Sequence, residues 1–154
     1  MSSLSRLTFG LLLAAALNVG CAVRQLADSR SGDSGGETTE PEASFRSVSP
    51  CSTEAAYTTT GTTITFATGF SDFNYNPKCL EVMAGSSVTF SGDFAAHPLL
   101  PSERRGVTTG NPIMLTNTGT SSSFTFPTAG FYAYFCELHG QDNGQFMDGV
   151  IWVK

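Results

Sequence analysis

The last part of the sequence gathers residue types that bind soft metal ions. Cys136 ends an apolar alternating run, and His139 and Met147 follow it in a Gly-rich stretch before a second β-branched run at 150–153. A thiolate, an imidazole and a thioether in one short loop need one more histidine to form the trigonal site with a weak axial methionine that holds blue copper. The sequence contains 2 histidines, so His97 is the candidate for the fourth ligand. The pattern predicts a strand, a ligand loop and a strand that together hold one copper ion.

Three stretches of the chain also carry a resemblance to a known family. They are Ala96-His97-Pro98-Leu99, the run from Phe124 to Cys136, and His139-Gly140 with Met147-Asp148-Gly149-Val150-Ile151. From about Thr60 to Lys154 the sequence resembles the plastocyanin/azurin family of copper proteins, the cupredoxins. The resemblance implies copper ligation by His97, Cys136, His139 and Met147, in that order along the chain.

Two features depart from the pattern of plastocyanin-like sequences. Seven residues separate His139 from Met147, which is more than is usual there, and Pro98 follows His97 where an asparagine often ties the two ligand loops together. The groups that orient the ligands must therefore be built differently in this chain. For Met147 an alternative stays open, in which it is an ordinary core residue at the start of the last strand.

The body of the chain, residues 50–154, consists of short runs rich in Thr, Val, Ile and Phe, broken by Gly, Pro, Asn and Ser. Such runs predict strands, and no long stretch has a helical period. We expect an all-β, cupredoxin-like Greek-key β-sandwich in which Ala84-Gly85-Ser86 joins two antiparallel strands. The predicted strands are Thr62–Phe66, Cys79–Met83, Ser87–Ser91, Ile113–Thr116, Ser123–Phe126, Phe131–Cys136 and Val150–Val153.

The N-terminal part predicts export followed by a flexible linker. Residues 1–20 read as a signal peptide, because Arg6 precedes an apolar core, Phe9–Leu17, that is too short to span a bilayer as a helix. A buried N-terminal helix is the alternative reading. Residues 21–49 form the predicted linker, in which 28–49 hold mainly Ser, Gly, Glu, Thr and Pro and too little apolar surface to order the backbone.

Cys21 directly follows the predicted signal peptide and resembles the lipid-modified cysteine of bacterial lipoproteins. We predict lipidation at Cys21, with simple secretion as the alternative. In either case the mature domain is expected outside the cytoplasm, in the periplasm or cell envelope, and lipidation would anchor it to a membrane through the linker.

The cysteine count bears on the metal site. With Cys21 assigned to the anchor, Cys51, Cys79 and Cys136 remain, and an oxidising compartment favours pairing two of them. We predict a disulfide between Cys51 and Cys79, which leaves the Cys136 thiol for the metal. The alternative, Cys136 in a structural disulfide, would leave no thiolate for copper.

The composition and the absence of certain motifs argue against several classes of function. A net charge of −5 argues against a nucleic-acid partner. The sequence shows no paired carboxylates, Ser/His/Asp set or phosphate loop, so we expect a non-enzymatic, monomeric type 1 (blue) copper protein that cycles between Cu(I) and Cu(II) as a one-electron carrier. It would dock weakly and transiently with redox partner proteins.

Other readings remain at this point. The same ligands suit an extracytoplasmic copper carrier or buffer, or zinc in vitro. A metal-free β-sandwich of the cell envelope is a further alternative. Arg104 and Arg105 could belong to a docking patch or be ordinary solvated surface charges.

Overall fold

The computed structural model describes residues 42–66, 73–104 and 106–154 of the 154-residue chain. The described residues all belong to one compact unit. The predicted signal peptide at 1–20, the lipidation at Cys21 and most of the predicted linker lie outside the described residues. Within the described part, no helix is long and apolar enough to cross a membrane.

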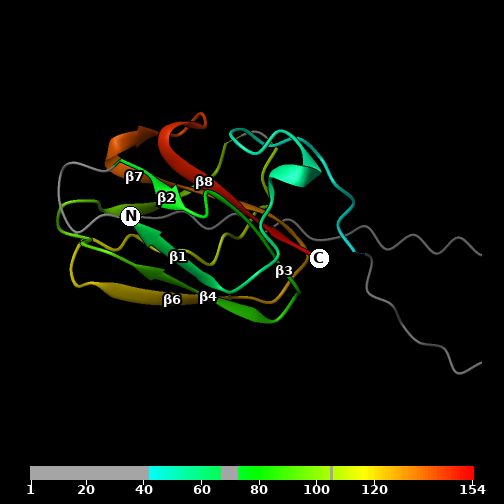
Figure 1. The fold of residues 1–154 in the computed structure, drawn as a ribbon, viewed down its shortest axis with the longest axis horizontal. Coiled ribbons are helices and arrows are strands. Elements are labelled where there is room, and N and C mark those ends of the chain that lie inside the picture. The colour runs from blue at the N-terminus through cyan, green and yellow to red at the C-terminus, as the bar shows by residue number, and fades with distance from the viewer. Residues whose placement is uncertain (1–41, 67–72, 105) are drawn as a thin grey trace, which may run out of the picture. The chain divides into compact units, whose positions relative to one another are not determined.

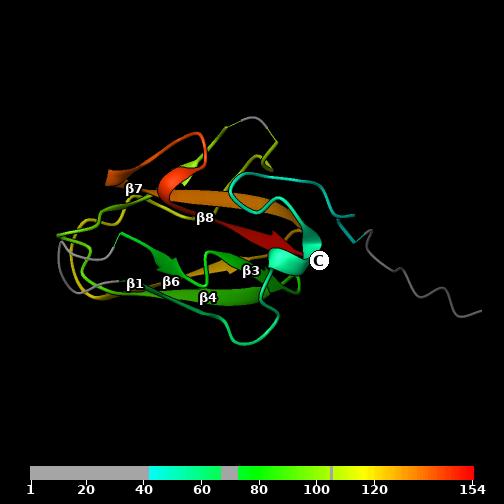
Figure 2. The ribbon, with the colours of Figure 1, turned by 45° about the horizontal axis from the view of Figure 1, so that its top comes forward.

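The described part is an all-β sandwich of two four-stranded sheets, as the sequence predicts (Figure 1). The first sheet has the order β2-β1-β4-β6 and the second the order β3-β8-β7-β5. Figure 2 shows β7 and β8 in one layer and β1, β4 and β6 in the other. The elements are η1 (Glu54–Ala56), β1 (Thr63–Phe66), β2 (Tyr75–Asn76), β3 (Cys79–Val82), β4 (Ser86–Ser91), β5 (Leu99–Ser102), β6 (Ser121–Phe126), β7 (Gly130–Gln141) and β8 (Gln145–Val153).

The first sheet has one buried and one polar face, as its alternating sequence requires. Val88 and Phe90 of β4 point into the core, whereas Thr89 lies on the outer face, where its hydroxyl is 2.7 Å from that of Ser123 in β6. Apolar side chains from both sheets fill the space between them in one cluster that includes Phe124. Burial of these rings is the main term that stabilises the sandwich.

The central strands of the second sheet, β7 and β8, are buried on both faces along most of their length. Along β7, Tyr132 and Tyr134 belong to the core between the sheets, and the alternate residues Phe131 and Ala133 belong to a second cluster on the outer face. Trp152 of β8 lies in this second cluster and stacks on Phe131 with ring centroids 5.5 Å apart. Strands covered on both sides carry continuous apolar runs, which explains the composition of β7 and of residues 150–153.

The segment that covers the outer face comes from the N-terminal side of the domain. Phe45 lies edge-on to Trp152 with 5.5 Å between centroids, the Trp152 indole donates a 3.0 Å hydrogen bond to the Ala43 carbonyl, and Val48 is buried. Residues 43–48 lie inside the segment for which the sequence predicted a flexible linker. They pack because Phe45 and Val48 are apolar side chains in a mainly polar stretch.

Other details differ from the prediction. The predicted strand Ile113–Thr116 is absent from the described strands, and only Thr116 forms an isolated bridge, to Leu99. Ala84-Gly85-Ser86 does not close a hairpin, because β3 and β4 belong to different sheets. Gly85, at φ 84°, instead turns the chain from one sheet to the other.

Candidate metal centre

Cys136 and His97 meet where β5 runs beside β7. Leu99 of β5 is paired with Cys136 of β7, and the Glu137 amide donates a 2.9 Å hydrogen bond to the Pro98 carbonyl. This backbone contact links the loop that carries His97 to the strand that carries Cys136. It is one of the contacts that join the two ligand segments in a chain with proline at position 98.

The His97 loop is shaped by local hydrogen bonds. The Asp93 carboxylate accepts from the Ala95 amide at 2.9 Å, and the Asp93 carbonyl accepts from the His97 amide at 2.9 Å. Aspartate often forms such turns because its short side chain reaches the backbone two residues ahead. The turn directs His97 inward, where the ring is buried with its centroid 6.1 Å from that of Phe66.

Three donor atoms converge at this end of the sandwich. The Cys136 Sγ lies 3.9 Å from His97 Nδ1 and 3.6 Å from His139 Nδ1, and the two Nδ1 atoms are 3.0 Å apart. An ion bound to thiolate and imidazole lies roughly 2.0–2.3 Å from each donor, so its ligands must be within about 4 Å of one another. The separations meet this condition, and the residues present therefore fit a metal ion.

The surroundings of the thiol and of the half-buried imidazole affect their protonation. Burial raises the pKa of the Cys136 thiol, and hydrogen bonds from the His139 and Leu138 amides act in the opposite direction. Burial and the neighbouring His97 both lower the pKa of His139, which favours the neutral ring needed for metal binding. A bound cation would complete the stabilisation of the thiolate.

His139 is the histidine nearer the surface. It is partly buried, whereas His97 is fully buried. The ring of Phe73, which is 43% exposed, packs at 4.5 Å between centroids against His139. Phe73 was not singled out from the sequence, because its neighbours in the chain give no sign that it would reach the metal loop.

Met147, the proposed axial ligand, is fully buried in the core cluster that contains Cys136. The two strands approach closely here: a Cβ added at Gly140 would overlap the Met147 carbonyl and lie 2.9 Å from the Cys136 carbonyl. Gly140 is therefore required by the close approach of the backbones. The predicted ligand loop is in fact the extended end of the β7–β8 hairpin, with an irregular register between Phe135 and Gly140.

The structure confirms the cysteine pairing. Cys51 and Cys79 form a disulfide, and Cys136 is the free thiol among the described cysteines. The alternative in which Cys136 is consumed by a structural disulfide is therefore wrong.

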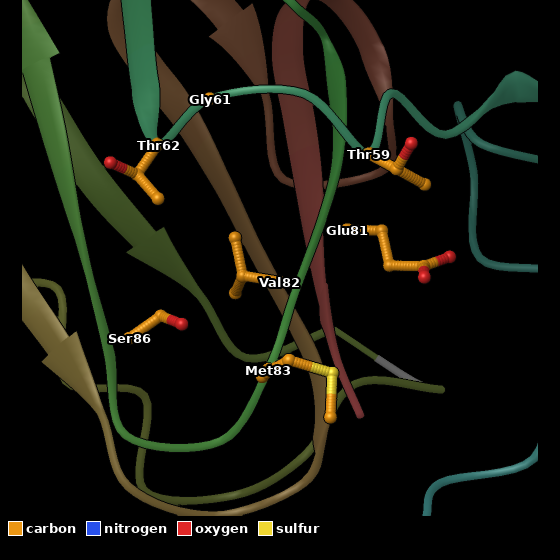
Figure 3. Close-up of a pocket in the computed structure, with 7 residues that line it drawn as sticks. All are labelled: Thr59, Gly61, Thr62, Glu81, Val82, Met83 and Ser86. Atoms are coloured by element: carbon orange, nitrogen blue, oxygen red, sulfur yellow. The ribbon is translucent and has the colours of Figure 1, made fainter.

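A surface groove lies at the opposite end of the sandwich. Glu81, its one carboxylate, already pairs with Lys154 at 3.0 Å, so the groove adds hydroxyl and apolar groups but no second set of metal ligands (Figure 3). It is lined by Thr59, Gly61, Thr62, Glu81, Val82, Met83 and Ser86.

The fold and the three convergent ligands define a β-sandwich metal-binding domain of the cupredoxin class. The chain belongs to the copper-binding proteins of the plastocyanin/azurin family, whose family model matches residues 62–154. A search of curated proteins gave no match.

Solved structures similar to this chain include several small copper proteins. A purple cupredoxin from Nitrosopumilus maritimus is 23% identical with a TM-score of 0.44, over 61% of this chain and 100% of that one. Plastocyanin from Dryopteris crassirhizoma is 23% identical with a TM-score of 0.44, over 58% and 99% of the two chains. Pseudoazurin from Hyphomicrobium denitrificans is 18% identical with a TM-score of 0.42, over 59% and 73%.

Proposed function

We propose that this domain holds one copper ion through His97, Cys136 and His139, with Met147 as a weak axial ligand, and acts as a one-electron carrier. The observation that carries the proposal is the convergence of one thiol sulfur and two imidazole nitrogens within 3.0–3.9 Å of one another. Copper would supply the redox couple, cycling between Cu(I) and Cu(II). The ligand set is that of a type 1 site.

The arrangement favours electron transfer over catalysis. Catalytic metal sites keep one position open for water or substrate, whereas here Met147 would fill the fourth position from inside the core. His97 and Cys136 are fully buried, so the protein limits the rearrangement of the ligands when the charge of the metal changes. These features support a redox site closed by protein ligands.

We propose that electrons pass between the copper site and a partner protein at His139 and Phe73. The His139 ring is partly buried, Phe73 is 43% exposed, and Leu138, which precedes His139 in the chain, is 59% exposed. We propose that redox partner proteins dock weakly on this apolar edge, because short-lived complexes suit repeated electron exchange.

We also propose that the domain works outside the cytoplasm, in the periplasm or cell envelope, tethered to a membrane through a lipid on Cys21. The Cys51–Cys79 disulfide supports an oxidising compartment. Mass spectrometry of the protein purified from membranes would test the anchor: the expected result is an acylated N-terminal Cys21, and an unmodified secreted chain would contradict it.

Voltammetry and electron self-exchange of the copper-loaded protein test the central proposal. We expect a reversible one-electron wave, and self-exchange without release of copper to a chelator. A copper carrier or buffer would instead transfer the ion rapidly to an acceptor. Failure to bind copper at all would contradict both functions.

Met147→Gln tests the axial position. An amide oxygen is a harder ligand than a thioether and favours Cu(II), so we expect the variant to keep its colour and to have a lower reduction potential. The measurement is a redox titration followed by the visible spectrum. An unchanged potential and spectrum with copper still bound would show that Met147 is ordinary core.

A further inference from the structure

We propose that residues 48–51, called the strap, together with Arg104 hold the tip of the ligand hairpin, residues 139–147, and that Arg104 is a positioning residue for the copper site. The strap lies before residue 62, where the family match begins. The inference rests on the proposed copper site but not on electron transfer. Figures 1 and 2 both show the cyan strap beside the turn that leads into β8.

The first contact joins the strap to the tip of the hairpin. The Ser49 hydroxyl donates a 3.3 Å hydrogen bond to the Gly144 carbonyl. A Cβ added at Gly144 would lie 2.7 Å from the Ser49 Cβ and 2.8 Å from its carbonyl oxygen. Gly144 also has φ +86°, so the turn needs glycine both for its conformation and for this close packing.

The second contact runs through Arg104. One guanidinium nitrogen, Nη2, donates to the Ser49 carbonyl in the strap, and the other, Nη1, donates to the Ser102 hydroxyl at 3.2 Å. Ser102 in turn donates to the Asp142 carboxylate at the hairpin tip. Arg104 therefore connects the strap, the end of β5 and the hairpin. A planar guanidinium can do this because its donors form a fixed fork.

The third contact holds the other strand of the hairpin. The Lys78 ammonium donates a 2.9 Å hydrogen bond to the carbonyl of Phe146, the residue before Met147. Phe146 has φ 68°, an uncommon value for a bulky residue that requires support from its surroundings. Lys78 precedes Cys79, whose disulfide to Cys51 fixes the end of the strap. The strap and this support are thus joined covalently.

A buried carboxylate lies beneath these contacts. Asp148, fully buried, lies 3.7 Å from the Lys78 ammonium, and within the described residues neither of its oxygens has a hydrogen-bond partner. The Lys78 cation thus compensates the charge of Asp148 while it holds the hairpin.

These contacts attach the tip of the long hairpin to the rest of the domain, in addition to the pairing between its own two strands. His139 lies on one strand and Met147 on the other, so movement of the tip changes the separation of two proposed ligands. Metal and active sites require positions held within about 0.5 Å by surrounding residues. Arg104 was a candidate surface charge from the sequence, but the structure gives it this internal, partly buried position.

Arg104→Gln is the main test. We expect amide hydrogen exchange in residues 139–147 of the metal-free protein to accelerate about tenfold, with exchange in β4 and β6 unchanged. We also expect copper transfer to an excess Cu(I) chelator to accelerate about tenfold, the lower end of the usual effect of removing a residue that orients metal ligands. Arg104→Lys keeps the charge but loses the fork, so it should behave like Arg104→Gln.

Arg46→Gln is the matched control. Arg46 lies before the strap, with its guanidinium carbon 5.0 Å from the centre of the Phe131 ring, so its loss removes the same charge away from the hairpin. It should leave both rates unchanged. Asp142→Ala is a milder variant at the exposed tip, for the case that Arg104→Gln does not fold, and should accelerate both rates in the same direction.

Two results would overturn the proposal. One is amide hydrogen exchange of residues 139–147 at the wild-type rate in the Arg104 or Asp142 variants. The other is an equal acceleration of this exchange in Arg46→Gln. The exchange experiment uses metal-free protein. It therefore decides the role of Arg104 even if the wild-type domain proves not to carry electrons.

Discussion

Replacing Cys136 by serine is expected to abolish the visible thiolate-to-Cu(II) absorption band while the domain remains folded. The band requires sulfur bound to copper, and a serine hydroxyl cannot supply it. Cys136 is one residue of a large apolar cluster, so the sandwich does not depend on its sulfur. The cost of burying a hydroxyl there is roughly 1–3 kcal/mol.

The measurement pairs the visible spectrum of copper-loaded protein with far-ultraviolet circular dichroism of the same sample. The double variant Cys51→Ala/Cys79→Ala is the control, because it also removes sulfur atoms but leaves Cys136 in place, and it should keep the band. A full band in Cys136→Ser would exclude Cys136 as a copper ligand and with it the type 1 site.

The same double variant is expected to lose about 3 kcal/mol of unfolding free energy. The disulfide joins residues separated by 28 positions, and a loop of this length restricts the unfolded chain by roughly that amount. The loss is a substantial fraction of the 5–15 kcal/mol total unfolding free energy of a typical domain. Denaturant unfolding of metal-free protein measures it without a contribution from copper binding.

Wild-type protein with its disulfide reduced is the control for this measurement, and it should unfold close to the double variant. A difference below about 1 kcal/mol between oxidised wild type and the variant would contradict the prediction. It would mean that the reduced, unfolded chain already keeps the two cysteine segments close together, so that the bond restricts it little.

The proposed metal ligands were easier to predict from the sequence than the residues that contact and position them. Cys136 and His139 are neighbours in the sequence, and the chain has only 2 histidines, so residue type alone led to His97. The contacts of Phe73, Lys78 and Arg104 join residues that are distant in the sequence. A local sequence pattern does not predict which distant residue a side chain will contact.

The strands show a similar division. Alternation predicted β4 and β6, whose outer faces are polar, and the apolar runs predicted β7 and the end of β8. β2 has two residues, too few for a pattern, and β5 contains Pro101, which argues against a strand. The predicted strand Ile113–Thr116 has the right composition, but of these residues only Thr116 forms a bridge, which shows that β-propensity depends on an available partner.

The place of β8 in its sheet has a consequence for the order in which the domain assembles. β8 is the last of the described strands along the chain, yet it lies between β3 and β7 and pairs in parallel with β3, which is far away in sequence. Non-local pairing of this kind slows folding, because chain entropy is lost before the contacts form. A nascent chain that ends before Gln145 carries Cys136 and His139 but has neither Met147 nor the strand that pairs with β3. We therefore expect copper to enter a domain that has already folded, rather than to guide the folding of the chain.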